Sequence, residues 1–530
     1  FLGGRDATWL AIGASIFASN IGSEHLIGLA GAGASSGMAM AHWEIQGWMI
    51  LILGWVFVPF YTRSMVYTMP EFLERRYNPQ SRTILSVISL VSYVLTKVAV
   101  TVYAGGLVFQ QVFGIKELWG IDFFWIAAIG LVVLTALYTI FGGMKSVLYT
   151  SVLQTPILLL GSLIILVLGF KELGGWDEMM RVCGAVTVND YGDTMTNLIR
   201  SNDDANFPWL GALIGSAIIG FWYWCTDQFI VQRVLSGKNE MEARRGTIFG
   251  AYLKLLPVFL FLIPGMIAFA LHQKYIGAGG EGFLPMLENG TANADAAFPT
   301  LVAKLLPAGV KGLVVCGILA ALMSSLASLF NSSAMLFTID FYKRFRPQTS
   351  EKKLVGIGQV ATVVIVILGI LWIPIMRSVG DVLYTYLQDV QSVLAPGIAA
   401  AFLLGICWKR TSAQGGMWGL ISGMVIGLTR LGAKVYYSNA GEVADSTFKY
   451  LFYDMNWLFF CGWMFLFCII VVIVVSLATE APTAEKIQGL VFGTATKEQK
   501  ASTRASWNHW DIIHTVIILA ITGAFYWYFW

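Results

Sequence analysis

The chain has 530 residues, of which 57% are hydrophobic and only 12% are charged, and its mean hydropathy is +0.70. Soluble domains carry about a quarter charged residues, so this composition excludes an ordinary soluble protein and indicates an integral membrane protein. The net charge of +3 is too balanced to indicate a nucleic-acid partner, and the six cysteines lack the CxxC spacing that would predict a zinc site.

Apolar stretches long enough to cross a bilayer recur along the whole chain, and no polar stretch is long enough to form a separate soluble domain. We therefore predict an all-α integral membrane protein with one transmembrane domain over 1–530. The thirteen predicted membrane helices cover 8–33, 41–62, 83–113, 121–141, 147–170, 208–232, 247–271, 308–342, 354–376, 382–408, 413–433, 450–478 and 511–530.

The Lys and Arg residues predict the orientation in the membrane. The loops that follow even-numbered helices carry about twice as many Lys and Arg as the loops that follow odd-numbered helices, and positive charge accumulates on the cytoplasmic side. We expect the even loops to be cytoplasmic and Trp530, at the C-terminus, to lie outside. The expected location is the plasma or inner membrane, with the lipid bilayer as a partner and with a monomer or a weak oligomer as the assembly.

Two of these helices have polar or bulky interruptions in their middle. The first reads "ASIFASNIGSEHLIGLAGAGASSG", and the sixth reads "GALIGSAIIGFWYWCTDQFIVQRVL". Each begins a group of five helices, and interruptions at matching positions of two halves are typical of inverted-repeat transporters. We predict one repeat over 8–171 and a second over 208–408, followed by accessory helices over 413–530.

Three polar residues within the predicted helices are candidates for a binding site. Glu44 is either an interfacial residue that reaches water or a hydrogen-bond acceptor in a cavity. Lys254 either extends back to the cytoplasm, the more common outcome near a helix end, or donates hydrogen bonds to hydroxyl groups inside the bundle. Gln388 is a helix-packing residue or a ligand contact.

The eighth and sixth helices offer two further candidates. Ala321, Ser324 and Ser325 share one helical face, where small residues usually indicate close helix packing and where two hydroxyls could instead help to bind a cation. Tyr223 and Trp224 lie beside a polar interruption, so they are either ordinary core aromatics or surfaces that stack on the C–H face of a sugar ring. A few polar groups in an apolar cleft are typical of a small-ligand site.

Several ordered motifs resemble those of the sodium/glucose cotransporters of the sodium/solute symporter family. They are "IFASNIGSEHLIGLAG", "YTMPEFLERRY", "FGGMKSVLYT", "FWYWCTDQFIVQR", "YLKLLP", "LMSSLASLFNSS" and "APGIAAAFLLGICWKR". The resemblance covers nearly the whole chain and implies a LeuT-type fold of two inverted five-helix repeats. It also implies a helix ahead of the core, which agrees with the start of this chain at Phe1.

The resemblance implies roles for residues that match the motifs. The implied sugar contacts are Asn20, His25, Glu44, Tyr223, Trp224, Lys254 and Gln388. The implied gate residues are Leu29, Trp43, Tyr223 and Tyr384. The implied sodium ligands are the carbonyls of Ala18, Ile21 and Ala321 and the hydroxyls of Ser324 and Ser325.

Two departures affect the expected number of ions. Family members that move a second sodium tend to have an acidic residue where this chain has Ser151, and a hydroxyl where it has Ala327. Burying a second charge without such ligands is costly, so we expect one sodium per sugar.

The resulting hypothesis is a sodium-driven importer of glucose or galactose that works by alternating access and needs no organic cofactor. A sodium-coupled inositol or polyol symporter is the alternative within the same class. A membrane enzyme would need clustered His and carboxylate groups, and the candidate around Asp511 fits a helix cap better. A sensor is a further alternative, for which the chain offers no soluble signalling domain.

Overall fold

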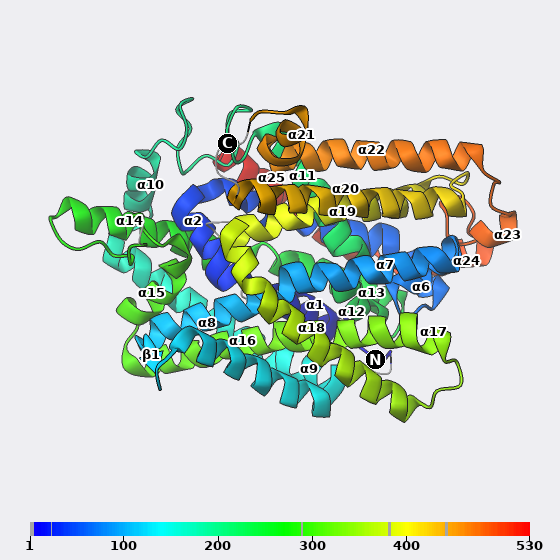
Figure 1. The fold of residues 1–530 in the computed structure, drawn as a ribbon, viewed down its shortest axis with the longest axis horizontal. Helices are drawn as coiled ribbons and strands as arrows, with labels where there is room; N and C mark the ends of the chain where they lie inside the picture. Colours follow the sequence, from blue (N-terminus) through cyan, green and yellow to red (C-terminus); the bar gives the residue numbers. More distant parts are fainter. Residues whose placement is uncertain (1–4, 23, 288–289, 380–382, 440–443) are drawn as a thin grey trace.

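The computed structural model describes residues 5–22, 24–287, 290–379, 383–439 and 444–530, and it leaves undescribed the side chains at 138, 140–155 and 375–379. Most of the described chain is helical, and the only strands in it are the two-residue β1 (Glu117–Leu118) and β2 (Ile121–Asp122), which pair antiparallel. Long helices run along one axis of the molecule, as Figure 1 shows. The prediction of a mainly α-helical membrane protein is confirmed.

The elements up to residue 184 include both halves of the first interrupted helix. They are α1 (Trp9–Asn20), η1 (Glu24–Leu29), α2 (Ala30–Ser36), η2 (Gly37–Met40), α3 (Ala41–Glu44), α4 (Gly47–Ile52), η3 (Leu53–Phe57), α5 (Val58–Ser64), α6 (Met69–Arg76), α7 (Pro79–Ser92), η4 (Tyr93–Val98), α8 (Ala99–Phe113), α9 (Phe123–Leu173) and α10 (Trp176–Gly184).

The elements from residue 209 to residue 407 include the second interrupted helix. They are α11 (Trp209–Gly220), η5 (Phe221–Thr226), α12 (Gln228–Leu235), α13 (Glu240–Leu253), η6 (Val258–Leu262), α14 (Ile263–Gly277), η7 (Ala294–Ala296), α15 (Ala297–Leu305), α16 (Ala308–Met335), η8 (Leu336–Tyr342), α17 (Lys343–Phe345), α18 (Glu351–Val379) and α19 (Leu383–Cys407).

The last 120 residues form further helical elements. They are α20 (Ala413–Asn439), α21 (Thr447–Lys449), η9 (Tyr450–Asp454), α22 (Trp457–Ala478), α23 (Ala484–Ile487), α24 (Lys497–Ala505) and α25 (His509–Tyr528). Of these, α20 and α22 pack on α19, while α25 packs on α4 and α13. The side chain of Asn508 caps α25, and Asp511 accepts a hydrogen bond from the Asn508 N–H. Asp511 is therefore part of a helix cap, in agreement with the sequence analysis.

Both predicted interruptions are present. The first helix stops at Asn20, Ile21 is extended, and the helix resumes as the π-helical η1 at Glu24. The sixth helix passes through the π-helical η5 and stops at Asp227, whose carboxylate accepts a hydrogen bond from Phe229 N–H and so caps α12. π-helical turns are frequent at functional sites, and here one lies next to each break.

Ten helices of the described chain are long and apolar enough to cross a membrane, and α1 and Phe123–Leu137 are shorter apolar helices. The sequence predicted thirteen crossings, and three predicted helices account for the difference, namely 8–33, 121–141 and 413–433. One apolar stretch, Glu24–Ser64, takes in parts of the first two predicted helices. The predicted helix 413–433 forms as α20 but is less apolar, because it is rich in glycine and carries Arg430.

The glycines of α20 allow unusually close packing against α19. A Cβ atom at Gly423 would lie 2.6 Å from the Cα of Gly397, and one at Gly427 would lie 2.2 Å from the carbonyl oxygen of Val393. Small residues at such contacts let two membrane helices approach and gain van der Waals contact. Close van der Waals packing against α19 therefore contributes to holding α20 in the bundle, in addition to its hydrophobicity.

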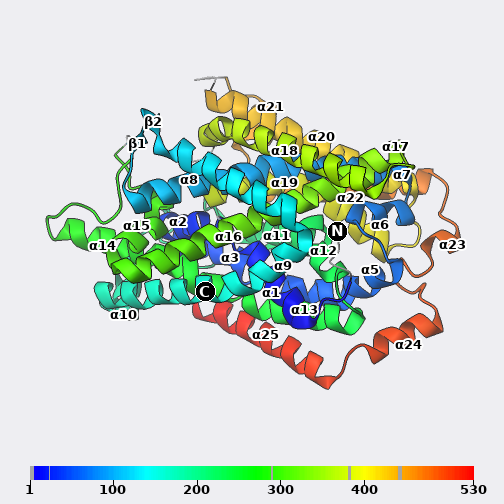
Figure 2. The same ribbon diagram turned by 90° about the horizontal axis from the view of Figure 1, so that it is seen from below.

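The structure has one helical run, α9, where the sequence predicted two helices over 121–141 and 147–170. A straight helix of 51 residues would extend about 77 Å. However, α9 begins beside β2 and ends beside α10, and Figures 1 and 2 place both of these at the same end of the molecule. The run therefore turns back on itself, as two membrane crossings require.

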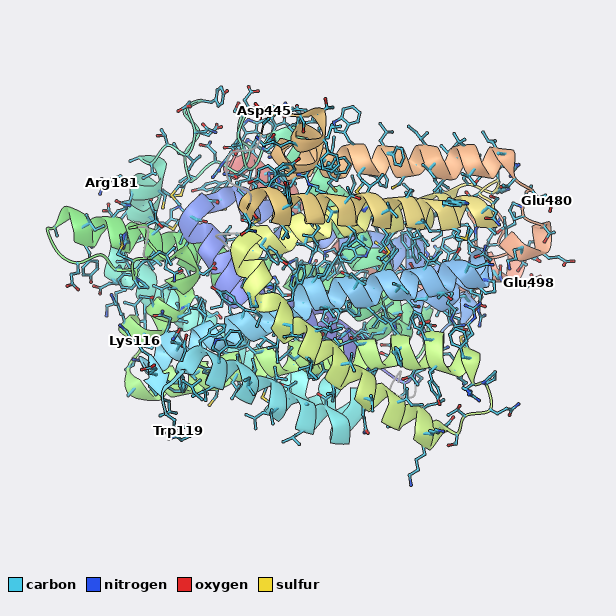
Figure 3. The ribbon with its side chains drawn as sticks, in the orientation of Figure 1. Lys116, Trp119, Arg181, Asp445, Glu480 and Glu498 are labelled. Atoms are coloured by element: carbon cyan, nitrogen blue, oxygen red, sulfur yellow. The ribbon has the colours of Figure 1, made fainter. Side chains whose placement is uncertain are left out.

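The predicted even and odd loops separate to opposite ends. The short helices α6, α17, α23 and α24 gather at one end, and α10, α15 and β1 gather at the other (Figures 1 and 2). Figure 3 shows the same division in the labelled charged side chains, with Glu480 and Glu498 at one end and Lys116 and Arg181 at the other. The C-terminus lies at the α10 end, where the Leu198 N–H donates to the Phe529 carbonyl at 2.8 Å.

Candidate binding cavity and cation site

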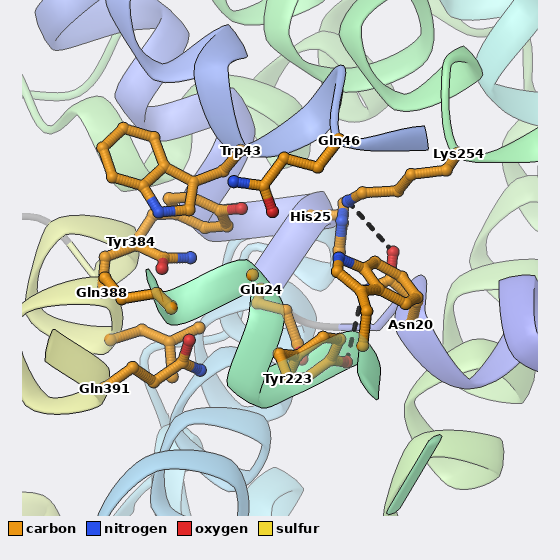
Figure 4. Close-up of a pocket in the computed structure, with 14 residues that line it drawn as sticks. Asn20, Glu24, His25, Trp43, Gln46, Tyr223, Lys254, Tyr384, Gln388 and Gln391 are labelled. Atoms are coloured by element: carbon orange, nitrogen blue, oxygen red, sulfur yellow. Dashed lines mark hydrogen bonds between the residues drawn. The ribbon is translucent and has the colours of Figure 1, made fainter. Parts of the chain in front are cut away.

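A small cavity of about 40 Å³ lies between the two interrupted helices, with room for a few water molecules. Most of its wall comes from the first, sixth and tenth predicted helices, and Lys254 and the residues around Trp43 complete it (Figure 4). The lining residues are Asn20, Glu24, His25, Trp43, Gln46, Ile219, Gly220, Tyr223, Trp224, Lys254, Tyr384, Leu387, Gln388 and Gln391.

A chain of hydrogen bonds crosses this cavity from one broken helix to the other. Lys254 Nζ donates to Asn20 Oδ1 at 3.2 Å, and Asn20 Nδ2 donates to the hydroxyl of Tyr223 at 3.2 Å, as the dashed lines in Figure 4 show. Lys254 Nζ also lies 5.4 Å from the centre of the Trp224 ring. The cavity wall is therefore a connected polar network with an aromatic surface behind it.

Glu44 lies behind the cavity wall and holds three of its members. Lys254 Nζ donates to Glu44 Oε2 at 2.6 Å, the Tyr384 hydroxyl donates to Oε1 at 2.5 Å, and His25 Nε2 lies 3.1 Å from Oε2. Glu44 is fully buried and Lys254 is 4% exposed. Neither side chain is exposed. The alternatives in which Glu44 reaches water at the interface and Lys254 extends back to the cytoplasm are therefore wrong.

Three fully buried polar atoms of lining residues have no hydrogen-bond partner among the described residues. They are the indole N–H of Trp43, the Nδ1 atom of His25 and the Oε1 atom of Gln388. Buried polar atoms without a partner are rare in folded proteins because each costs about 1–3 kcal/mol. Such atoms beside a cavity are ready to bind a ligand that both donates and accepts hydrogen bonds.

The four expected gate residues do not share one position. Trp43, Tyr223 and Tyr384 line the cavity. Trp43 stacks on Trp457, with ring centres 5.5 Å apart. Tyr384 packs closely on Gly28, where an added Cβ atom would lie 2.9 Å from the Cβ of Tyr384. Leu29 is fully buried and does not line the cavity.

One of the expected sodium ligands, Ser325, lies against the break in the first helix. Among the described residues, no backbone N–H donates to the carbonyls of Ala18 or Ile21. Across from them, the buried Ser325 hydroxyl has no described partner, and a Cβ atom at Gly22 would lie 2.5 Å from it. Ala321 and Ser324, on the same face of α16, are also buried. Free carbonyls and hydroxyls are hard oxygen ligands that suit a cation such as sodium.

A second buried ion pair lies behind Tyr223. Lys97 Nζ lies 2.6 Å from Asp227 Oδ2, and the Tyr93 hydroxyl donates to Asp227 Oδ1 at 2.7 Å. Lys97 Nζ is also 4.7 Å from the centre of the Tyr223 ring. The pair connects the break in the sixth helix to η4. This pair was not predicted from the sequence, although a lone lysine in the apolar run 83–113 indicates a buried functional or paired charge.

Six of the seven expected substrate contacts line the cavity, and Glu44 supports it from behind. Sequence reasoning missed three polar lining residues, namely Glu24, Gln46 and Gln391. Gln391 was detectable because it follows Gln388 by three residues and so shares its helical face. Gln46 donates to the carbonyl of Ser216 at 2.8 Å, a contact between distant segments that no local pattern indicates.

Comparisons with solved structures agree with this architecture. A sodium-coupled sialic acid symporter in a substrate-bound, outward-open state matches with a TM-score of 0.68 at 22% identity, covering 91% of this chain and 92% of that one. MhsT in complex with L-phenylalanine matches with a TM-score of 0.51 at 12% identity, covering 89% and 99%. At these identities the likeness shows the fold, which is the LeuT type with additional C-terminal helices.

Sequence relatives narrow the assignment. The human sodium/myo-inositol cotransporter 2 is 37% identical over 507 residues, which cover 93% of this chain and 74% of the relative. The sodium/myo-inositol cotransporter of the dog, Canis lupus familiaris, is 37% identical over 515 residues, covering 93% and 71%. The profile of the sodium:solute symporter family matches residues 1–423. This multi-pass membrane protein therefore belongs to the sodium:solute symporter family and is a sodium-coupled symporter of a small solute.

Proposed function

We propose that this chain imports a neutral cyclic polyol of the inositol type together with sodium. The observation that carries the proposal is the set of partnerless polar atoms around the cavity, on Trp43, His25 and Gln388. A hydroxyl group both donates and accepts hydrogen bonds, so a ring bearing several hydroxyls can satisfy all three atoms at once.

The charges around the cavity favour a neutral ligand. Lys254, the cation of the lining, is paired with Glu44, and Lys97 behind Tyr223 is paired with Asp227. Removing one partner of a buried ion pair is strongly destabilising. A charged substrate would have to compete for these partners, whereas a polyol can add hydrogen bonds to the network and leave both pairs intact.

The relatives favour inositol over the hexose that the sixth helix suggested. Those described above are sodium/myo-inositol cotransporters. Glucose or galactose is the second candidate, because Tyr223 and Trp224 present aromatic faces that suit the C–H face of either ring.

We propose that one sodium ion accompanies each substrate and binds between α1 and α16. The ligands would be the carbonyls of Ala18, Ile21 and Ala321 and the hydroxyls of Ser324 and Ser325. Inward movement of one charge down a membrane potential contributes about 2.3 kcal/mol per 100 mV. A bound ion would hold the two helices together and preorganise the cavity, so that each ligand raises the affinity for the other.

Alternating access would then come from movement of the proposed repeats, 8–171 and 208–408, around the cavity. The end of the molecule that carries α6, α17 and α24 would face the cytoplasm, with the protein in the plasma or inner membrane. Cys407, an exposed residue at the end of α19, offers a test. A membrane-impermeant thiol reagent should label it only after permeabilisation.

Uptake into proteoliposomes tests the substrate. Labelled myo-inositol should accumulate when sodium is outside and should not accumulate in a potassium gradient. Unlabelled myo-inositol should compete at least tenfold better than glucose or galactose. Competition in the reverse order would support the hexose alternative, and uptake without any sodium dependence would contradict the proposal as a whole.

A further inference from the structure

Glu24 is one of the three polar lining residues to which the sequence analysis gave no role, and it is the acidic one. It is the first residue of η1, directly after the break in the first helix. Its side chain lines the cavity together with Asn20 and Tyr223 (Figure 4). A carboxylate at this position stands between the substrate cavity and the break that exposes the carbonyls of Ala18 and Ile21.

The geometry around Gly22 places this carboxylate beside the cation site. A Cβ atom at Gly22 would lie 2.5 Å from Ser325 Oγ and 2.9 Å from Glu24 Oε2. Together these two distances place the hydroxyl and the carboxylate oxygen no more than 5.4 Å apart. Oxygen ligands of Ca²⁺, a cation of similar size to sodium, lie at about 2.3–2.6 Å, so two ligands of one ion can be up to about 5.2 Å apart.

We infer that the Glu24 carboxylate is a ligand of the transported sodium ion and connects that ion to the substrate cavity. The inference rests on the proposed site between α1 and α16 and extends it. Burying a monovalent cation is costly unless a charge compensates it. The other proposed ligands are carbonyls and hydroxyls, whereas Glu24 supplies a carboxylate on the same side of the break.

This position makes Glu24 a coupling residue. When sodium binds, the carboxylate is drawn toward Ser325, and the shape and charge of the cavity wall change with it. Sodium therefore alters the affinity for the substrate through a side chain that contacts both sites, and the substrate must alter the affinity for sodium by the same factor. Gly22 leaves the space that this contact needs, since a larger residue would occupy it.

The variant Glu24→Gln tests the inference because it removes the charge and keeps the size. Sodium should be titrated into the purified protein without substrate, with thermal unfolding as the readout and potassium as the replacement ion. We expect the half-saturating sodium concentration to rise at least tenfold. Substrate affinity at saturating sodium should stay within threefold, and the ratio of substrate affinities with and without sodium should fall toward one. Glu24→Asp, which keeps the charge, should give an intermediate sodium affinity.

Two further variants separate this inference from the proposals on which it rests. Glu178→Gln, which removes an ion-paired carboxylate at the surface of α10, should leave the sodium response unchanged. If Ser325→Ala weakens the sodium response and Glu24→Gln stays within twofold of the parent, the role of Glu24 is wrong and the sodium site stands. If neither variant changes the response, both the site and this inference fail.

A further outcome is that Glu24→Gln changes substrate binding and leaves sodium binding unchanged. Should Glu24→Gln lose substrate affinity tenfold at saturating sodium while its sodium titration matches the parent, Glu24 is a substrate contact and the inference is overturned. The unfolding temperature in potassium shows whether each variant is folded. If Glu24→Gln is not folded, Glu24→Asp decides, because a shorter carboxylate should still weaken sodium binding measurably.

Discussion

The two sides of the broken first helix handle their polar groups differently. On the cavity side, Lys254, Glu44 and Tyr384 satisfy one another through short hydrogen bonds. On the α16 side, the buried hydroxyls of Ser325 and Ser328 have no partner among the described residues. Both sides are buried in the same bundle, so exposure to water does not explain the contrast.

The difference shows which kind of ligand each side suits. The ion pair of Lys254 and Glu44 leaves little for a charged ligand to gain, whereas the remaining donors and acceptors of the cavity suit a neutral ligand. Carbonyl and hydroxyl oxygens have lone pairs that can coordinate a cation. One helix break thus separates the cavity that we propose for a polyol from the site that we propose for sodium.

The largest expected effect comes from breaking the ion pair on the cavity side. Lys254→Met leaves the Glu44 carboxylate buried without its main partner, and such a loss costs about 3–5 kcal/mol of stability. The double variant Lys254→Met/Glu44→Gln should recover most of this stability but still lack substrate uptake. Thermal unfolding and uptake in proteoliposomes measure the two effects.

A surface ion pair provides the matched control for this variant. Arg181→Met removes an exposed partner of Glu178 and should change stability little, because solvent screens surface ion pairs. Normal uptake by well-folded Lys254→Met protein would contradict the placement of Lys254 at the binding site.

The second prediction concerns the ion side. Ser325→Ala removes one oxygen ligand and should raise the half-saturating sodium concentration by about 5–150-fold, which corresponds to about 1–3 kcal/mol. Stability should change little, because the hydroxyl has no partner to lose. Ser162→Ala, which removes another buried and partnerless hydroxyl, is the control. Equal half-saturating sodium concentrations for Ser325→Ala and Ser162→Ala would contradict the assignment of sodium to the α16 side of the break.

The third prediction separates the two ligands at the cavity. Gln388→Ala should weaken substrate binding by about 1–2 kcal/mol, within the range for one lost hydrogen-bond partner, and leave sodium binding without substrate unchanged. Isothermal titration of each ligand gives both values. Gln488→Ala, in an exposed loop, should change neither value. A substrate affinity within twofold of the parent would show that Gln388 only packs helices.

The smallest expected effect is that of a hydroxyl added to the ion side. Ala327 is fully buried on α16, and the side chain of Ser151, the other position considered for a second ion, lies outside the described residues. Because a second sodium needs a carboxylate as well as a hydroxyl, Ala327→Ser alone should leave the ratio at one sodium per substrate. Reversal potentials at a fixed sodium gradient measure this ratio. A value near two in the parent protein would refute the single-ion proposal.

Local sequence properties were enough to establish much of this protein. Hydrophobicity and helical period are properties of short segments, and they predicted the membrane helices, the two breaks and the shared face of Ala321, Ser324 and Ser325. The ordered motifs identified the family and the residues of the cavity wall. They pointed to a hexose, because Tyr223 and Trp224 indicate a ring-shaped ligand without distinguishing a sugar from an inositol.

Only the tertiary structure decided which polar groups meet. Lys254 and Glu44 are 210 residues apart in the chain, and Lys97 and Asp227 are 130 apart, so no local pattern can pair them. Glu24 reads as one more polar residue in a broken helix until Gly22 brings its carboxylate close to Ser325 on α16. The physical reason is that a buried charge is stabilised by whatever lies within a few ångströms of it, and the packing of distant helices determines those neighbours.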